Sequence, residues 1–142
     1  MKSKQEAETL MNAILPVAEK MLKQYGEFYP YGGYMKLDGS IVHVGAEDPD
    51  TDRPRSKDLL YVLWSSFREM AERNECKAVA VAFNISVALP NSGQKSDAIQ
   101  VSIEHVGGYS VEVFFPYHLT NGELVYGETL VQQGKHEVFA VT

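Results

Sequence analysis

The stretch from Lys77 to Leu89, KAVAVAFNISVAL, constrains the fold more than any other part of the chain. Its odd-numbered positions from 79 onward carry Val, Phe, Ile and Leu, whereas most of its even-numbered positions carry Ala. A period of two with β-branched residues is typical of a β-strand. Because both faces of this strand are apolar, both must be covered by other parts of the chain. We therefore expect this strand to form the backbone of the core.

Length and charge limit the kinds of partner. The chain has 142 residues, which is most simply one domain spanning residues 1–142. Its formal net charge of -6 and pI near 5.2 argue against nucleic acid as a partner, because binding to a phosphate backbone requires clustered Lys and Arg. The longest apolar run, Ala78 to Phe83, is too short to span a membrane, and Met1 to Glu8 is polar, unlike a signal peptide. We expect a cytoplasmic protein that does not bind a membrane.

Two segments have apolar residues at intervals of three or four, the spacing of an amphipathic helix. The first runs from Ser3 to Gln24, with Glu6 at the capping-box position and Gly26 as a natural stop. Pro16 removes a backbone hydrogen bond in its interior, so we expect a kink there or two shorter helices. The second helix is predicted from about Lys57 to Asn74.

The only cysteine, Cys76, follows the second predicted helix and has no partner for an internal disulfide. The dipole at a helix C-terminus disfavours a thiolate. We therefore expect Cys76 to be a structural thiol in a reducing cytoplasm rather than a nucleophile.

Several turns can be predicted from alternating strands. An Asp38-Gly39 turn of two residues would place Met35 opposite Val42. A three-residue loop from Val106 to Gly108 would place Ile103 opposite Val111, with Gly108 in a left-handed conformation.

The last predicted turn is Asn121-Gly122, which would join Tyr117 to Thr120 with Glu123 to Tyr126 in a small hairpin. Between Ile99 and Glu104, and again between Ser110 and Phe115, apolar residues alternate with polar ones, which indicates two half-exposed strands. The tail after Gln132 either docks against an edge or frays.

The element order is therefore helix, two strands, helix, three strands and a small C-terminal hairpin. This order favours the α+β class, with an antiparallel sheet of about five strands and the two helices on one face. Pairing the fifth strand with the first gives the strand order 2-1-5-4-3, and in element order the chain resembles the profilin-like and roadblock-like group. That order would place the Lys77 strand at an edge, where a long apolar strand needs a cover. We therefore expect a homodimer or a protein partner on that strand or on its Ala-lined face.

Three motifs resemble those of a family of small bacterial proteins that has no established activity. They are EFYPYGG from Glu27 to Gly33, the Asp38-Gly39 pair, and YGE from Tyr126 to Glu128. The likeness covers about Gln24 to Gln133 and implies a bacterial cytoplasmic protein, without implying a mechanism. Small acidic α+β proteins of this kind also resemble immunity proteins, which neutralise a toxin.

Motifs for catalysis or metal binding are absent from the sequence. There is no GxSxG, P-loop, GxGxxG or HExxH pattern. The acidic stretch from Glu47 to Arg55 lacks the Gly and Glu positions of a calcium loop, so we expect a solvated loop. The histidines lack the spacing of metal ligands, and we expect each to be isolated: His43, His105, His118 and His136. No cofactor and no metal is predicted.

Two classes of function remain open. The favoured one is a non-catalytic protein-binding or regulatory protein whose partner contacts the open sheet face, with Tyr31, Tyr117 and Tyr126 as contact residues, because Tyr gives contact area at low entropic cost. The alternative is a small-molecule-binding protein or an enzyme with a pocket between a helix and the sheet. That pocket would lie near three residues: Tyr34, His43 and Trp64.

Overall fold

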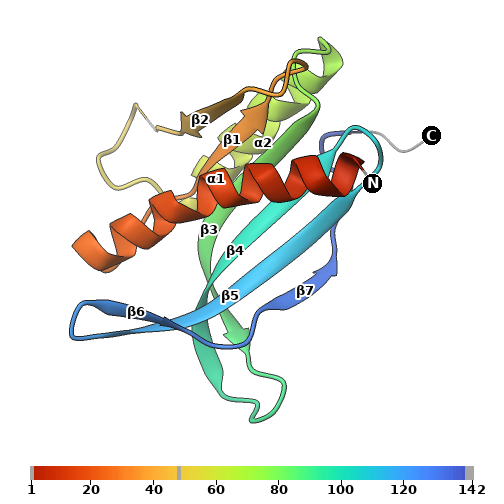
Figure 1. Cartoon of the computed structure of the whole chain (residues 1–142). Helices are drawn as coiled ribbons and strands as arrows, with labels where there is room; N and C mark the ends of the chain where they lie inside the picture. Colours follow the sequence, from red (N-terminus) through yellow and green to blue (C-terminus); the bar gives the residue numbers. More distant parts are fainter. Residues whose placement is uncertain (1, 48, 140–142) are drawn as a thin grey trace.

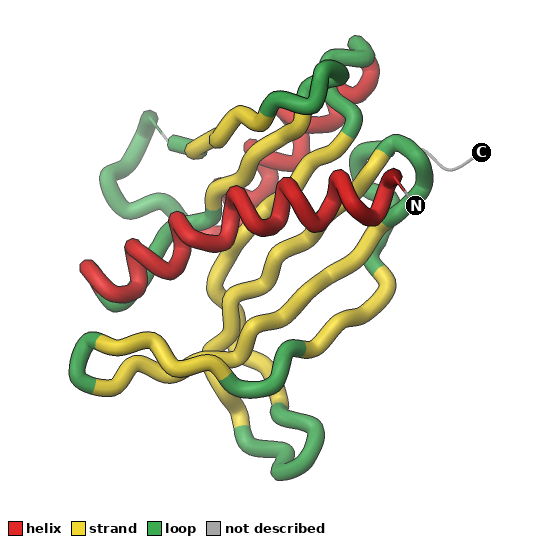
Figure 2. Tube along the Cα trace, in the orientation of Figure 1, coloured by secondary structure: helices red, strands yellow, loops and turns green. Residues whose placement is uncertain are grey.

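The computed structural model describes residues 2–47 and 49–139, and Figure 2 shows how helices and strands follow one another in space. Asp48 of the acidic loop and residues 140–142 of the tail lie outside the described residues. In chain order the elements are α1 (Lys2–Tyr25), β1 (Tyr31–Met35), β2 (Ile41–Gly45), α2 (Ser56–Glu72), β3 (Ala78–Ala88), β4 (Lys95–His105), β5 (Ser110–Thr120), β6 (Glu123–Tyr126) and β7 (Leu130–Gln133). The predicted α+β class and element order are confirmed.

The strands form one antiparallel sheet in the order β2-β1-β3-β4-β5-β6, with β7 paired to the other part of β5. The sheet therefore has seven strands rather than about five, and the predicted order 2-1-5-4-3 is wrong. β1 pairs with residues 78–82 of β3, placing Tyr34 opposite Val79, so this half of the Lys77 strand lies between β1 and β4, whereas residues 83–88 are paired to β4. A strand that is apolar on both faces is best buried between neighbours, whereas an edge would leave it exposed to association.

The two helices lie on opposite faces of the sheet, so their predicted placement on one face is wrong. Figure 1 shows α1 crossing in front of the sheet and α2 behind it. On the α1 side of β3, Ala78, Ala80 and Ala82 belong to one core cluster, and on the α2 side Val79 and Val81 belong to a second. The apolar pattern of β3 required cover on both faces, and each helix supplies one.

Two glycines of the EFYPYGG motif allow both helices to approach β1. A Cβ on Gly32 would lie 2.4 Å from the Ala80 carbonyl oxygen and 3.2 Å from the Phe67 ring of α2. A Cβ on Gly33 would lie 2.4 Å from Ile14 Cδ1 of α1. Because such contacts are too close for a side chain, this part of the motif serves packing on the two faces.

α1 continues through Pro16 as one helix rather than two. At this turn the Tyr31 hydroxyl accepts a hydrogen bond from the Ala18 amide at 2.9 Å and donates one to the Ile14 carbonyl. In a regular α-helix those two backbone groups would bond each other. The Tyr31 side chain is therefore inserted into the backbone ladder where Pro16 already weakens it, one of the recognised causes of helix bending.

Two of the three predicted turns are confirmed. The loop of residues 106–108 places Ile103 opposite Val111, and Gly108 has a positive φ of 97°. The Asn121-Gly122 turn joins β5 to β6 as predicted, with both turn residues at positive φ.

The Asp38-Gly39 turn differs from its prediction by one residue. Met35 lies opposite Ile41 rather than Val42, and the Lys36 amide donates to the Ser40 carbonyl at 2.8 Å. The loop is therefore three residues long, 37–39, with Gly39 at a φ of 93°. A shift of one residue exchanges the faces of every side chain in β2, so Val42 lies beside Tyr34 on the face opposite to that of Met35.

The tail docks behind the sheet, and we call residues 134–139 the C-terminal strap. The Glu104 carboxylate of β4, which is 2% exposed, accepts the backbone amides of residues 137, 138 and 139 at 2.9, 3.0 and 3.3 Å. Phe139 enters the core under α2. Further hydrogen bonds join Ser110 Oγ to the Lys135 carbonyl (2.6 Å), Arg68 Nε to the Glu137 carbonyl (2.8 Å) and Arg68 Nη2 to Glu137 Oε2 (3.0 Å).

Candidate functional site

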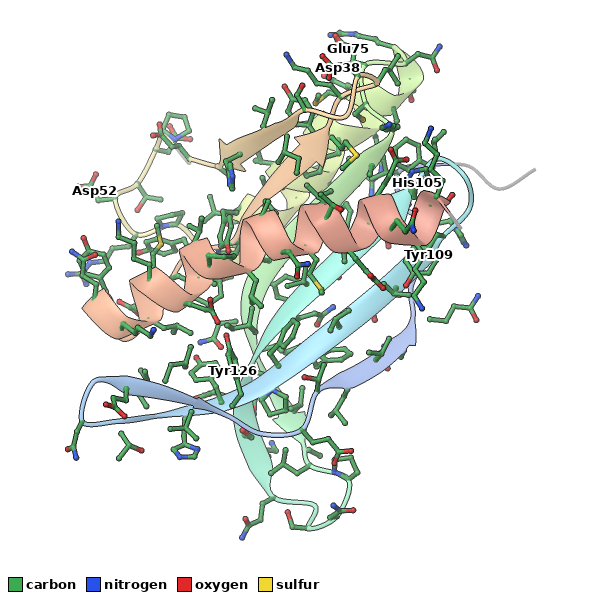
Figure 3. The ribbon with its side chains drawn as sticks, viewed as in Figure 1. Asp38, Asp52, Glu75, His105, Tyr109 and Tyr126 are labelled. Carbon is green, nitrogen blue, oxygen red and sulfur yellow. The ribbon has the colours of Figure 1, made fainter. Side chains whose placement is uncertain are left out.

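The three tyrosines predicted to contact a partner do not form a common exposed surface. Tyr31 and Tyr117 belong to the core under α1 and are 8% and 5% exposed. Tyr126 is 38% exposed, but its hydroxyl donates to Glu19 Oε2 of α1 at 2.7 Å, and Figure 3 shows it between β6 and α1. Burial, followed by the Glu19 carboxylate, raises the pKa of Tyr126. These side chains stabilise the fold through packing and hydrogen bonds. The expectation that Tyr31 and Tyr117 are exposed contact residues is therefore wrong.

The alternative pocket near Tyr34, His43 and Trp64 is not formed as a group. Tyr34 and Trp64 pack against the core under α2, where the Tyr34 ring lies edge-on to Phe67. His43 lies opposite Gly33, and a Cβ on Gly33 would point toward Ile14 of α1, so His43 is on the α1 side of the sheet. The sheet therefore separates His43 from the other two residues, although Trp64 lines a pocket of its own.

His105 is the one histidine with a buried network among the described residues. Its Nδ1 accepts the Gly107 amide at 2.9 Å, so its proton is on Nε2, which lies 2.8 Å from Glu6 Oε1. Glu6 also pairs with Lys77, and Figure 3 shows His105 beside the start of α1. Glu6 therefore joins α1 to the sheet instead of capping its own helix. Lys77, and then His105, hold the pKa of Glu6 below its usual 4.5. The other histidines are exposed: His43, His118 and His136.

The described residues do not assemble a nucleophilic or metal centre. Cys76 is buried, and this burial, followed by the charge of Glu75, raises the pKa of its thiol to about 11. A protonated thiol is a poor nucleophile, consistent with the structural role expected of Cys76. Within residues 2–47 and 49–139, no group of three or more His, Cys, Asp or Glu could hold a metal ion.

One face of the sheet is left partly uncovered on the α2 side. A row of directly opposed residues crosses four strands there: Phe83 in β3, Gln100 in β4, Phe114 in β5 and Leu130 in β7. The apolar residues of this region are only half-buried by the described chain. We call them the open face: Phe83, Ile85, Val87, Phe114 and Leu130. The predicted open face, free of both helices, is not formed, because each face of the sheet carries one helix. The open face defined here is the uncovered part of the α2 side, and its residues are not the predicted tyrosines.

A pocket of about 200 Å³ adjoins this open face. Trp64 of α2 and Phe83 of β3 supply aromatic surface, and Gln100 and Ser102 of β4 supply polar groups. The opposite side is formed by Glu112 of β5 and by the C-terminal strap. We call it the Trp64 pocket; its lining also includes Ile103, Glu104, Ser110, Val111, Gly134, Lys135 and Glu137.

The polar residues of β4 in this region are buried, which the sequence pattern did not reveal. Gln100, Ser102 and Glu104 are 6%, 7% and 2% exposed, whereas their alternation with apolar residues predicted a solvated face. Gln100 Nε2 donates to Ser102 Oγ at 3.0 Å, and Glu104 binds the strap. Buried polar side chains on a central strand are more informative than exposed apolar ones. The alternation of apolar and polar residues carries no signal of this burial, because the cover comes from α2 and the C-terminal strap.

Comparisons with known proteins found no relative. No family model, no curated protein and no solved structure matches this chain. The resemblance carried by EFYPYGG, Asp38-Gly39 and YGE therefore stays a prediction. In the described part of the chain, neither helix is long and apolar enough to cross a membrane.

Proposed function

We propose that this chain is a non-catalytic binding protein that recognises a protein partner through the open face and the Trp64 pocket. The observation that carries the proposal is their adjacency: Phe83, an open-face residue, also lines the pocket and lies opposite Gln100. An apolar centre with polar groups around it is the usual composition of a protein interface.

The size and chemistry of the pocket favour binding over catalysis. At about 200 Å³ it is smaller than most small-molecule sites, which span roughly 300–1,000 Å³, but it can receive one side chain. Side chains inserted into such desolvated pockets dominate the affinity of many protein interfaces. The residues that line it include no histidine and no cysteine.

The setting that we propose is the bacterial cytoplasm, as the resemblance implies. A single buried thiol suits a reducing compartment. An acidic binding protein of this kind could act as an immunity protein does, by occupying a surface of a toxin. The net charge of -6 supports a partner that is basic where it makes contact.

The test is capture of partners from a bacterial lysate by the immobilised full chain, with a matched pair of variants. Ile85→Lys places a charge on the open face, and Ser86→Lys places the same charge on the opposite face of the same strand. We expect Ile85→Lys to lose at least one protein that the wild-type chain and Ser86→Lys both retain. Thermal unfolding must give similar midpoints for both variants. Identical captured sets from all three chains would refute the proposal.

A further inference from the structure

The Trp64 pocket contains more hydrogen-bond acceptors than donors. Because Gln100 Nε2 already donates to Ser102 Oγ, the Gln100 side-chain carbonyl remains as an acceptor, and the Ser102 hydroxyl proton is free to turn. Glu112 presents a carboxylate at the pocket wall. A ligand that matches these groups must supply several donors.

The carboxylates of the pocket differ in how far they are already satisfied. Glu104 accepts three backbone amides, and Glu137 pairs with Arg68 at 3.0 Å. Glu112 Oε1 accepts only an amide, Gln132 Nε2 at 2.6 Å, and no cation in the described part of the chain forms an ion pair with it. Glu112 is therefore the carboxylate whose charge remains available to a ligand.

The aromatic wall selects among cations. The Trp face attracts a cation more strongly than Tyr or Phe does, and a planar guanidinium can stack on it while its edge donates to oxygens. An ammonium group is more strongly hydrated and cannot stack. The volume of about 200 Å³ suits one such side chain.

We infer that the Trp64 pocket binds the guanidinium group of an arginine side chain presented by the partner protein. The group lies against Trp64, donates to Glu112 and reaches the Gln100 carbonyl. This inference rests on the proposed function, since the arginine belongs to the partner. Lys135 also lines the pocket, and its positive charge opposes the ligand.

The test uses the fluorescence of Trp64, which is the only tryptophan in the chain and therefore reports on the pocket alone. The full chain is titrated at low salt with a capped arginine amide, a short arginine-containing peptide, and the capped citrulline and lysine amides. We expect a saturable change with both arginine ligands and weaker binding of the lysine amide. Citrulline has the same shape without the charge, and we expect no saturation with it. No saturable change with arginine, or equal binding of citrulline, would overturn the inference.

Three variants locate the site. We expect Glu112→Gln to weaken binding of the arginine peptide about tenfold, as for the loss of a charge-assisted hydrogen bond. Lys135→Gln should tighten binding, and Glu123→Gln, at the tip of the β5–β6 hairpin, should leave it unchanged. Equal affinity of Glu112→Gln and the wild-type chain would contradict the site.

Two results separate this inference from the proposed function. If Glu112→Gln captures the same lysate proteins as the wild-type chain while Ile85→Lys does not, the protein-binding function stands and the arginine site fails. If the free arginine amide binds as tightly as the peptide and no lysate protein is captured, the site takes a small guanidino compound and the inferred protein source is wrong.

Discussion

A single hydroxyl, that of Tyr31, completes the backbone of α1, and its removal can be measured. In Tyr31→Phe the Ala18 amide and the Ile14 carbonyl lose the group that now lies between them. We expect the free energy of unfolding to fall by about 1–3 kcal/mol, because these groups are buried. Urea denaturation measures this, and Tyr29→Phe, at a 53% exposed tyrosine, should change stability by less than about 0.5 kcal/mol. Equal stability of Tyr31→Phe and the wild-type chain would mean that the helix closes its own hydrogen bond.

Also at the scale of residues, the contacts of Glu6 predict a pH dependence. Lys77 and His105 lower the pKa of Glu6 in the folded protein, so its ionised form stabilises the fold. This contribution is complete above the unfolded pKa near 4.5 and is lost as the pH falls through the lower folded value. Glu6→Gln should therefore cost about 0.5–1 kcal/mol at pH 7, the range for a pair partly screened by solvent, and progressively less as the pH falls toward 2.

The measurement is chemical denaturation of both chains between pH 7 and pH 2. A difference between Glu6→Gln and wild type that persists unchanged at pH 2 would show that the substitution acts through packing instead of charge. Glu8→Gln, an exposed neighbour in α1, serves as the control and should follow the wild-type curve closely.

At the scale of elements, the C-terminal strap depends on one carboxylate. Glu104→Gln replaces an acceptor of three amides with a group that has one oxygen and two donors. We expect the strap to open, with amide exchange at residues 137–139 rising at least about tenfold, since each hydrogen bond to a charged group contributes about 1.5–3 kcal/mol. Exchange in β3 should change far less. Exchange of the strap amides at the wild-type rate would mean that other contacts hold the strap.

The elements also mark what the sequence can and cannot predict. Periodicity located both helices and the main strands, and register arguments fixed the loop of residues 106–108, because a wrong loop would have placed Glu112 opposite Ile103. Periodicity could not decide which strand neighbours β1. The two apolar faces of β3 did indicate that both faces of the sheet are covered. The prediction that both helices lie on one face was inconsistent with that indication. The candidate site was missed because burial of Gln100 and Ser102 depends on α2 and the strap, which are distant in sequence.

For the whole molecule, β1 covers residues 78–82 of β3 and so shortens the edge on which a homodimer was predicted to residues 83–88. The outer strands β2, β6 and β7 are short, with 5, 4 and 4 residues, and short edges resist strand pairing between molecules. We therefore expect the purified chain to be a monomer of 15.9 kDa at micromolar concentration, by native mass spectrometry and by sedimentation.

The same measurement of mass shows whether a second copy of the chain covers the open face when no other protein is present. A mass of twice 15.9 kDa that persists on dilution would contradict the monomer. If Ile85→Lys then restored the single-chain mass while Ser86→Lys did not, the open face would be occupied by a second copy of the chain. If both variants remained dimeric, the contact would lie elsewhere, and the open face would stay available to the partner proposed above.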